Sequence, residues 1–154
     1  TRRLSSAASD VYKRQGHYYL YKKKNPFKHL IYPLPNSNGH GIHAGMDIEN
    51  NLRFGPNAKW VDSIDYSFDE NTLEEFCNSI KSYWVNFDPS CLSPDYTGIR
   101  SKIVAEGEGS QDFEILDASD HGLENLIHLQ GIDSPGLTSS LSIAAEVISK
   151  LGIH

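Results

Sequence analysis

The chain has 154 residues, of which 38% are hydrophobic and 22% are charged, and its formal net charge is −6. This composition is typical of one folded domain and excludes a wholly disordered chain. An acidic protein does not suit phosphate backbones, which argues against nucleic acid as the main partner. No apolar run approaches the roughly 18 residues of a membrane span, so only peripheral membrane contact is left open.

Two cysteines, Cys77 and Cys91, are too far apart for a CxxC pair. No secretory signal accompanies them, so we expect two reduced thiols in a cytoplasmic protein, or a mitochondrial one if the source is eukaryotic. The first fifteen residues, TRRLSSAASDVYKRQ, resemble translated adapter sequence, and we expect residues 1–15 to be a non-native leader. An Arg- and Ser-rich transit peptide is the alternative.

Strands and hairpins are expected in the first half of the chain. His17–Tyr21 is an aromatic run with strand character, and His29–Pro33 predicts a second strand that ends at its proline. Apolar and polar residues alternate in Gly41–Ile48, which predicts a half-buried strand. The Glu49–Asn51 turn then returns the chain through Leu52–Phe54 as a hairpin.

The clearest helix is Asn71–Trp84, in which Asn71 and Glu74 form a capping pair. Its apolar face, which we expect to cover a sheet, consists of Leu73, Phe76, Cys77, Ile80 and Trp84. Further strands are predicted at Tyr96–Ile103, Phe113–Leu116 and Leu126–Gln130. The pattern therefore predicts an α+β fold with a mostly antiparallel mixed sheet and a covering helix.

The segment HLQGIDSPGLTSSLSIA predicts a strand, a tight turn and a helix. Ser134 can cap the helix, Pro135 suits its first position, and Gly136 allows a ligand close to the backbone. The helix is expected to bury one face, made of Leu137, Leu141, Ala144, Ile148 and Leu151. A helix N-terminus attracts electron-rich groups, although the pattern taken alone favours a purely structural cap.

Eight ordered blocks carry a resemblance to a known family: GHYYLY, LIYPLP, GIHAGMDI, LRFGPNA, WVDSIDY, YTGIRSKI, DFEIL and GIDSPGLTSSLSIA. Together they resemble the FAD-dependent oxidoreductases of the D-amino-acid oxidase superfamily, in particular its L-2-hydroxyglutarate oxidase/dehydrogenase-like branch. The resemblance implies a substrate-binding sheet with its covering helix at 16–110, and a return into the FAD-binding domain at 111–154. The G-x-G-x-x-G unit that cradles FAD phosphates is absent, so the expected partner is the missing N-terminal FAD-binding half.

The resemblance also implies site residues. Arg100 matches the arginine that holds the substrate carboxylate, and a guanidinium suits that role because it pairs with a carboxylate through two hydrogen bonds. Lys102 shares the strand face of Arg100 and could bind the second carboxylate of a dicarboxylic acid. Tyr32 could donate its hydroxyl to a carboxylate. Surface ion pairs and packing are the structural alternatives for these three residues.

His43 lies in the block that matches a substrate-sheet strand with a histidine near the flavin. A neutral imidazole could take the hydroxyl proton during oxidation, because its reference pKa of about 6.5 suits base catalysis. A structural histidine is the alternative. A metal site at His40, His43 and Asp47 is not expected, since a strand places the two histidines on opposite faces.

The resemblance assigns the FAD contact to Gly131, Ile132, Ser134, Pro135, Gly136, Leu137 and Thr138. We therefore expect the C-terminal part of an FAD-dependent oxidoreductase that oxidises a small 2-hydroxy acid, with L-2-hydroxyglutarate as the first candidate. An amino-acid or amine oxidase of the same superfamily is one alternative, because carboxylate anchoring serves both reactions. A free-standing α+β binding module without enzymatic activity is the other.

Overall fold

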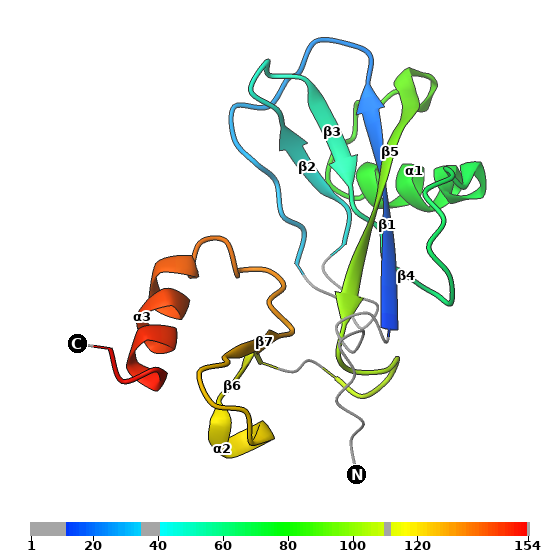
Figure 1. Cartoon of the computed structure of the whole chain (residues 1–154). Helices are drawn as coiled ribbons and strands as arrows, with labels where there is room; N and C mark the ends of the chain where they lie inside the picture. Colours follow the sequence, from blue (N-terminus) through cyan, green and yellow to red (C-terminus); the bar gives the residue numbers. More distant parts are fainter. Residues whose placement is uncertain (1–11, 35–40, 110–111, 154) are drawn as a thin grey trace. The chain divides into compact units, whose positions relative to one another are not determined.

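The computed structural model describes residues 12–34, 41–109 and 112–153, and Figure 1 shows the arrangement of its elements. The first half contains β1 (Tyr12–Tyr21), β2 (His43–Met46), β3 (Leu52–Gly55), β4 (Lys59–Val61), the 3₁₀ turn η2 (Glu70–Thr72) and α1 (Leu73–Lys81). The second contains the 3₁₀ turn η3 (Pro89–Cys91), β5 (Leu92–Lys102), β6 (Glu114–Leu116), α2 (Ala118–His121), β7 (His128–Gln130) and α3 (Ser140–Lys150). The chain forms two compact units, one of residues 14–99 and a second that contains the described residues from Arg100 onward.

The larger sheet has the strand order β2-β3-β1-β4, and β5 pairs with β1 as well. β3 is antiparallel to both of its neighbours, so that Phe54 lies opposite Tyr19 on one side and Ala44 on the other. The predicted α+β class with a mostly antiparallel sheet is confirmed. The His17–Tyr21 strand, the β2–β3 hairpin and the strand after Tyr96 are all present, although β5 begins earlier, at Leu92.

The hydrophobic core lies between this sheet and α1, which crosses behind the strands in Figure 1. Phe76 and Ile80 from α1 are completely buried and belong to the same cluster as Tyr19, Leu52 and Phe54 from the sheet. Each such side chain contributes roughly 1.5–3 kcal/mol through burial. The covering role predicted for this helix is therefore confirmed.

Three local expectations in this unit are wrong. His29–Pro33 is not a strand: Ile31 alone exchanges a pair of 3.0 Å hydrogen bonds with Ala44, and Pro33 has no N–H with which to extend the pairing. The helix starts at Leu73 and ends at Lys81, and the preceding turn is capped by Asp69 rather than by the predicted pair. Leu73 is 42% exposed, so it is not part of the buried face.

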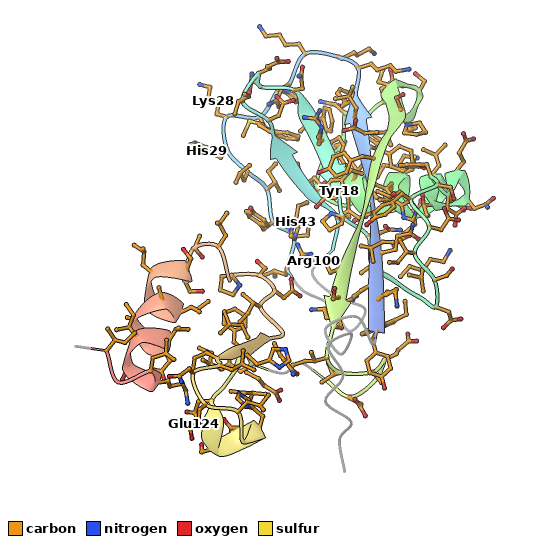
Figure 2. All side chains as sticks on the ribbon, viewed as in Figure 1. Tyr18, Lys28, His29, His43, Arg100 and Glu124 are labelled. Carbon is orange, nitrogen blue, oxygen red and sulfur yellow. The ribbon has the colours of Figure 1, made fainter. Side chains whose placement is uncertain are left out.

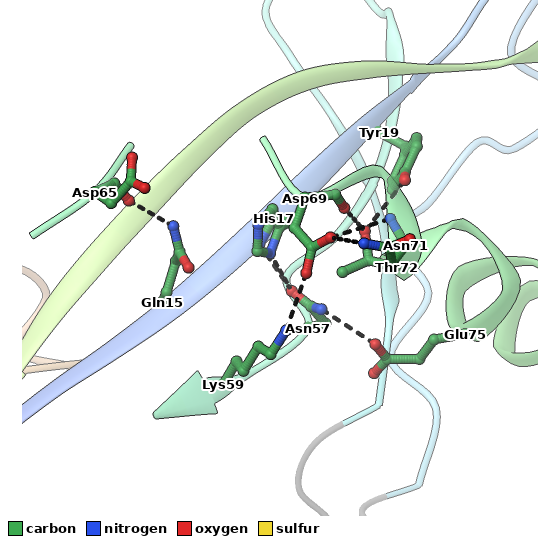
Figure 3. A network of polar contacts seen from close by, with 10 residues as sticks. All are labelled: Gln15, His17, Tyr19, Asn57, Lys59, Asp65, Asp69, Asn71, Thr72 and Glu75. Atoms are coloured by element: carbon green, nitrogen blue, oxygen red, sulfur yellow. Dashed lines mark hydrogen bonds and ion pairs between the residues drawn. The ribbon is translucent and has the colours of Figure 1, made fainter. Parts of the chain in front are cut away.

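A polar network connects β1 to the segment that leads into α1 (Figure 3). His17 is completely buried, and Asn57 Oδ1 accepts hydrogen bonds from its backbone N–H (2.8 Å) and its Nδ1 (3.1 Å). Asn57 Nδ2 in turn donates to Glu75 (3.1 Å). Nearby, the Tyr19 hydroxyl lies 3.1 Å from Thr72 Oγ1. Buried polar groups are stable only when they are paired, so this network fixes β1 against α1.

The second unit contains the β6–β7 ribbon, in which Ile115 lies opposite Leu129. α3 begins at Ser140, six residues later than the predicted cap at Ser134, because residues 134–139 form hydrogen-bonded turns. The expected burial of its apolar face is wrong: Leu141 is 86% exposed and Ile148 is 49% exposed. Within the described residues, no helix is both long and apolar enough to cross a membrane.

Candidate active site

Arg100 and Lys102 converge on one carboxyl group. They lie two residues apart at the end of β5, and residues two apart on a strand project to the same face. Arg100 Nη1 lies 3.0 Å from Asp133 Oδ1, and Lys102 Nζ contacts Asp133 Oδ2. The two cations therefore meet at a single carboxylate, whereas a dicarboxylic acid would need donors at two separated points.

Asp133 is held by its own turn as well as by the two cations. Its Oδ1 accepts a hydrogen bond from the Ser134 N–H at 2.6 Å. Partial burial raises the pKa of this carboxyl group, but the hydrogen bonds from Lys102 and Ser134 outweigh burial and leave the pKa below its ordinary value. Asp133 is therefore ionised at neutral pH and keeps both cations paired.

A pocket of about 300 Å³ opens beside this cluster. It is lined by Arg100, Ser101, Ile103, Leu129, Gly131, Ile132 and Asp133. Its lining combines apolar side chains with one charged pair, and such a combination is common in sites for small molecules.

The start of the predicted flavin-contacting turn lines this pocket, through Gly131, Ile132 and Asp133. Gly131 has a φ of +65°, and a Cβ there would lie 2.7 Å from Ile103 Cδ1, so only glycine fits. Gly136 is buried, and its N–H donates to the Asp133 carbonyl, so it closes the turn. The remaining side chains of the predicted set are exposed: Ile132, Ser134, Pro135, Leu137 and Thr138.

The exposed side chains of this turn have the chemical groups that a contact with a flavin ring needs. Exposed apolar side chains such as Ile132 and Leu137 can pack on a planar ring system, and the hydroxyl groups of Ser134 and Thr138 can bind its polar edge. The helix-capping arrangement expected at Ser134 is absent, since α3 starts at Ser140 without a side-chain cap. Flavin contact by residues 131–138 stays a prediction.

His43 and Tyr32 belong to the unit of residues 14–99. His43 lies at the start of β2 (Figure 2), and its ring meets the Tyr32 ring edge-on, with centroids 4.4 Å apart. His43 is half-buried, whereas Tyr32 is 62% exposed. The structure thus brings these two predicted residues together, and their catalytic and binding roles stay predictions.

The metal site that was considered and not expected involved His40, which lies outside the described residues. Asp47 is paired with Arg53. No group of three potential metal ligands occurs among the residues that the structure describes.

The sequence did not single out Asp133 as a functional residue. Its place in the predicted cofactor-binding turn was visible in the sequence, but its contact with two cations 31 and 33 residues away was not.

Comparison with known proteins identifies the family. The model of the family described as FAD dependent oxidoreductase (DAO) matches residues 2–150. The chain is 35% identical over 138 residues to a mitochondrial L-2-hydroxyglutarate dehydrogenase of Arabidopsis thaliana, an alignment that covers 83% of this chain and 29% of that protein. It is 30% identical over 158 residues to a glycerol 3-phosphate dehydrogenase of Caloramator mitchellensis, covering 96% of this chain and 30% of that protein.

A solved structure shares the fold. It is the dithionite-reduced L-α-glycerophosphate oxidase of Mycoplasma pneumoniae with FAD bound, which matches with a TM-score of 0.71 and 19% identity over 93% of this chain and 37% of that one. The chain thus spans about a third of the length of the proteins it matches. These comparisons favour the flavoenzyme over a free-standing module. The chain belongs to the family of FAD-dependent oxidoreductases.

Proposed function

We propose that this chain is the substrate-binding and flavin-contacting part of an enzyme that oxidises a small 2-hydroxy acid, with L-2-hydroxyglutarate as the first candidate. The observation that carries the proposal is the position of Arg100, a carboxylate-binding side chain, in the lining of the pocket that Gly131, Ile132 and Asp133 of the predicted flavin-contacting turn also line. The similarity to a protein named L-2-hydroxyglutarate dehydrogenase supports the choice of substrate.

In the proposed reaction, Arg100 binds the carboxylate next to the reacting carbon and so fixes the position of that carbon. His43 takes the proton of the hydroxyl group as the alcohol becomes a ketone. Bound FAD supplies the acceptor for the hydride that leaves the same carbon. The turn at 131–138 orients the cofactor, and the apolar side chains Ile103 and Ile132 exclude water from one side of the pocket.

Oxidation of glycerol 3-phosphate is the second candidate. Two similar proteins carry that substrate in their names, a dehydrogenase of Caloramator mitchellensis and an oxidase of Mycoplasma genitalium. Arginine and lysine bind phosphate as well as carboxylate. Amino-acid oxidation remains a further candidate, because a carboxylate anchor serves it equally.

A substrate panel tests the proposal. The full-length flavoprotein that contains this chain is purified and mixed without oxygen with L-2-hydroxyglutarate, D-2-hydroxyglutarate, glycerol 3-phosphate or L-glutamate. We expect the flavin absorbance near 450 nm to bleach rapidly with the L-hydroxy acid only. Bleaching by glycerol 3-phosphate or the amino acid instead would assign the enzyme to that substrate.

For the location of the parent protein, we propose the cytoplasm, or mitochondria if the source is eukaryotic. Similar enzymes of Arabidopsis thaliana and Dictyostelium discoideum are named as mitochondrial, which supports the second location. The proposed partner of this chain is the FAD-binding half of the same enzyme, because a third of the length cannot supply most of the cofactor contacts.

A further inference from the structure

Asp133 joins the two parts of the candidate site. On one side it binds the predicted substrate anchor, through the 3.0 Å contact with Arg100 Nη1 and the contact with Lys102 Nζ. On the other side it belongs to the turn that is predicted to contact the flavin. One carboxylate therefore connects the end of β5 to that turn.

The turn holds this carboxylate in a fixed place. The Ser134 N–H binds Asp133 Oδ1 at 2.6 Å, and the Asp133 N–H binds the Gly131 carbonyl at 2.8 Å. The Gly136 N–H closes the turn on the Asp133 carbonyl at 2.5 Å. Both the backbone and the side chain of Asp133 form hydrogen bonds within the turn. The carboxylate therefore keeps its position when the longer Arg100 and Lys102 side chains move.

Arg100 keeps binding capacity in this arrangement. A guanidinium has five N–H donors, and the contact with Asp133 runs through Nη1. The Arg100 side chain is 55% exposed, whereas that of Asp133 is 19% exposed. The remaining donors of Arg100 can therefore bind a substrate carboxylate while Asp133 stays in place.

We infer that Asp133 is a positioning residue that acts through Arg100: it holds the guanidinium at a set distance from the 131–138 turn, so that a bound carboxylic acid presents its reacting carbon to the flavin. This inference rests on the proposed function. It assigns Asp133 no contact with the reacting atoms.

A simple counter-ion would behave differently. Removal of the carboxylate leaves Arg100 and Lys102 with more net positive charge, which by itself tightens the binding of any anion. Loss of positioning instead lowers the rate after binding, because a displacement of about 1 Å can cost on the order of a hundredfold in rate. The two roles are therefore separated by measuring the substrate dissociation constant and the rate of flavin reduction independently.

The test uses Asp133→Asn in the full-length flavoprotein, with anaerobic stopped-flow measurement of flavin reduction. We expect the saturating rate to fall by about ten- to a hundredfold, while flavin content is unchanged and the substrate dissociation constant does not increase. Asp117→Asn is the matched control, since Asp117 forms a comparable 2.9 Å ion pair with Lys150 away from the pocket. It should leave both quantities unchanged.

A double-mutant cycle checks that Asp133 acts through Arg100. In an Arg100→Ala background, Asp133→Asn should cause little further loss of rate, whereas independent effects would multiply.

An unchanged saturating rate in Asp133→Asn, or a loss of bound flavin, would overturn the inference. If that variant is insoluble, Asp133→Glu replaces it: it keeps the charge but moves the carboxylate by one methylene group, so the saturating rate should again fall, and an unchanged rate would count equally against the inference.

The controls keep the two proposals apart. If the unmodified flavoprotein is not reduced by any 2-hydroxy acid, the proposed function fails. If it is reduced and Asp133→Asn is reduced equally fast, only the positioning role of Asp133 fails.

Discussion

Asn57 connects β1 to α1 through the two polar atoms of one side chain. Its Oδ1 serves both the backbone N–H and the imidazole of His17, and its Nδ2 donates to Glu75. His17 Nδ1 must carry the proton to donate to this oxygen, and His17 Nε2 has no partner among the described residues. Asn57 is therefore the residue on which the buried histidine depends.

Asn57→Ala should lower the free energy of unfolding by about 2–4 kcal/mol, because it leaves two buried donors of His17 without an acceptor. Urea unfolding of the chain, followed by fluorescence, measures the change. Asn25→Ala is the control: it removes an exposed hydrogen bond to Asn50 and a partly buried one from the Phe27 N–H, and it should cost no more than about 1 kcal/mol. Equal effects of the two variants would contradict the role given to Asn57.

At the scale of single residues, the sequence predicted the cations of the site and not their counter-ion. Arg100 and Lys102 could be placed on one face from strand periodicity alone. Asp133 lies 33 residues from Arg100, and no local pattern encodes a contact at that separation. The buried position of His17 was missed for the same reason, since its partner Asn57 is 40 residues away.

At the scale of elements, only one face of α1 packs against the core. Ile80 is completely buried in the cluster with the sheet, whereas Leu73 on the same helix is 42% exposed. Ile80→Ala should therefore cost about 2–5 kcal/mol of unfolding free energy. Leu73→Ala, which removes a similar side chain, should cost less than about 1 kcal/mol. Urea midpoints that move equally would show that the helix packs by a different face.

The β2–β3 hairpin depends on an ionised carboxylate. Asn51 and Arg53 donate to Asp47 and hold its pKa well below the ordinary 3.8. Folded Asp47 thus binds fewer protons than unfolded Asp47 at acidic pH. The stability it contributes is fully present above about pH 4 and decreases as the pH falls toward the lowered folded-state value.

Asp47→Asn tests this dependence. The variant should unfold at lower urea concentration than the parent chain at pH 7, and the difference should narrow as the pH falls from about 4 to about 2. Denaturation midpoints across that range measure it. A difference that stays constant with pH would mean that the charge of Asp47 does not stabilise the hairpin.

Element identity was more predictable than element boundaries. The apolar period of residues 71–84 predicted a helix, yet the helix ends at Lys81, since the chain turns to place Trp84 against the core. The strand expected at His29–Pro33 has suitable residues but is reduced to one bridge at Ile31. Tertiary packing decided both outcomes, and a local pattern does not contain it.

At the scale of the whole molecule, the hydrophobic core belongs to one unit. Among the residues that the structure describes, the ten buried hydrophobic ones all lie between Tyr19 and Cys91, in the unit of residues 14–99. The apolar period of residues 137–151 correctly predicted a helix, α3, but not its burial: Leu141 and Leu137, which precedes α3, are almost fully exposed. Among the described residues no surface covers them, and the chain spans only about a third of the proteins it resembles.

The central claim is that this chain carries the carboxylate anchor of a flavin-dependent oxidase or dehydrogenase. The most direct measurement compares anaerobic flavin reduction by L-2-hydroxyglutarate in the full-length protein and in its Arg100→Ala variant. Both proteins should purify with bound flavin, and the variant should lose about ten- to a hundredfold in the second-order rate constant for reduction, as expected when charge-assisted hydrogen bonds are removed. A colourless parent protein, or a variant that is reduced as fast as the parent, would contradict the account.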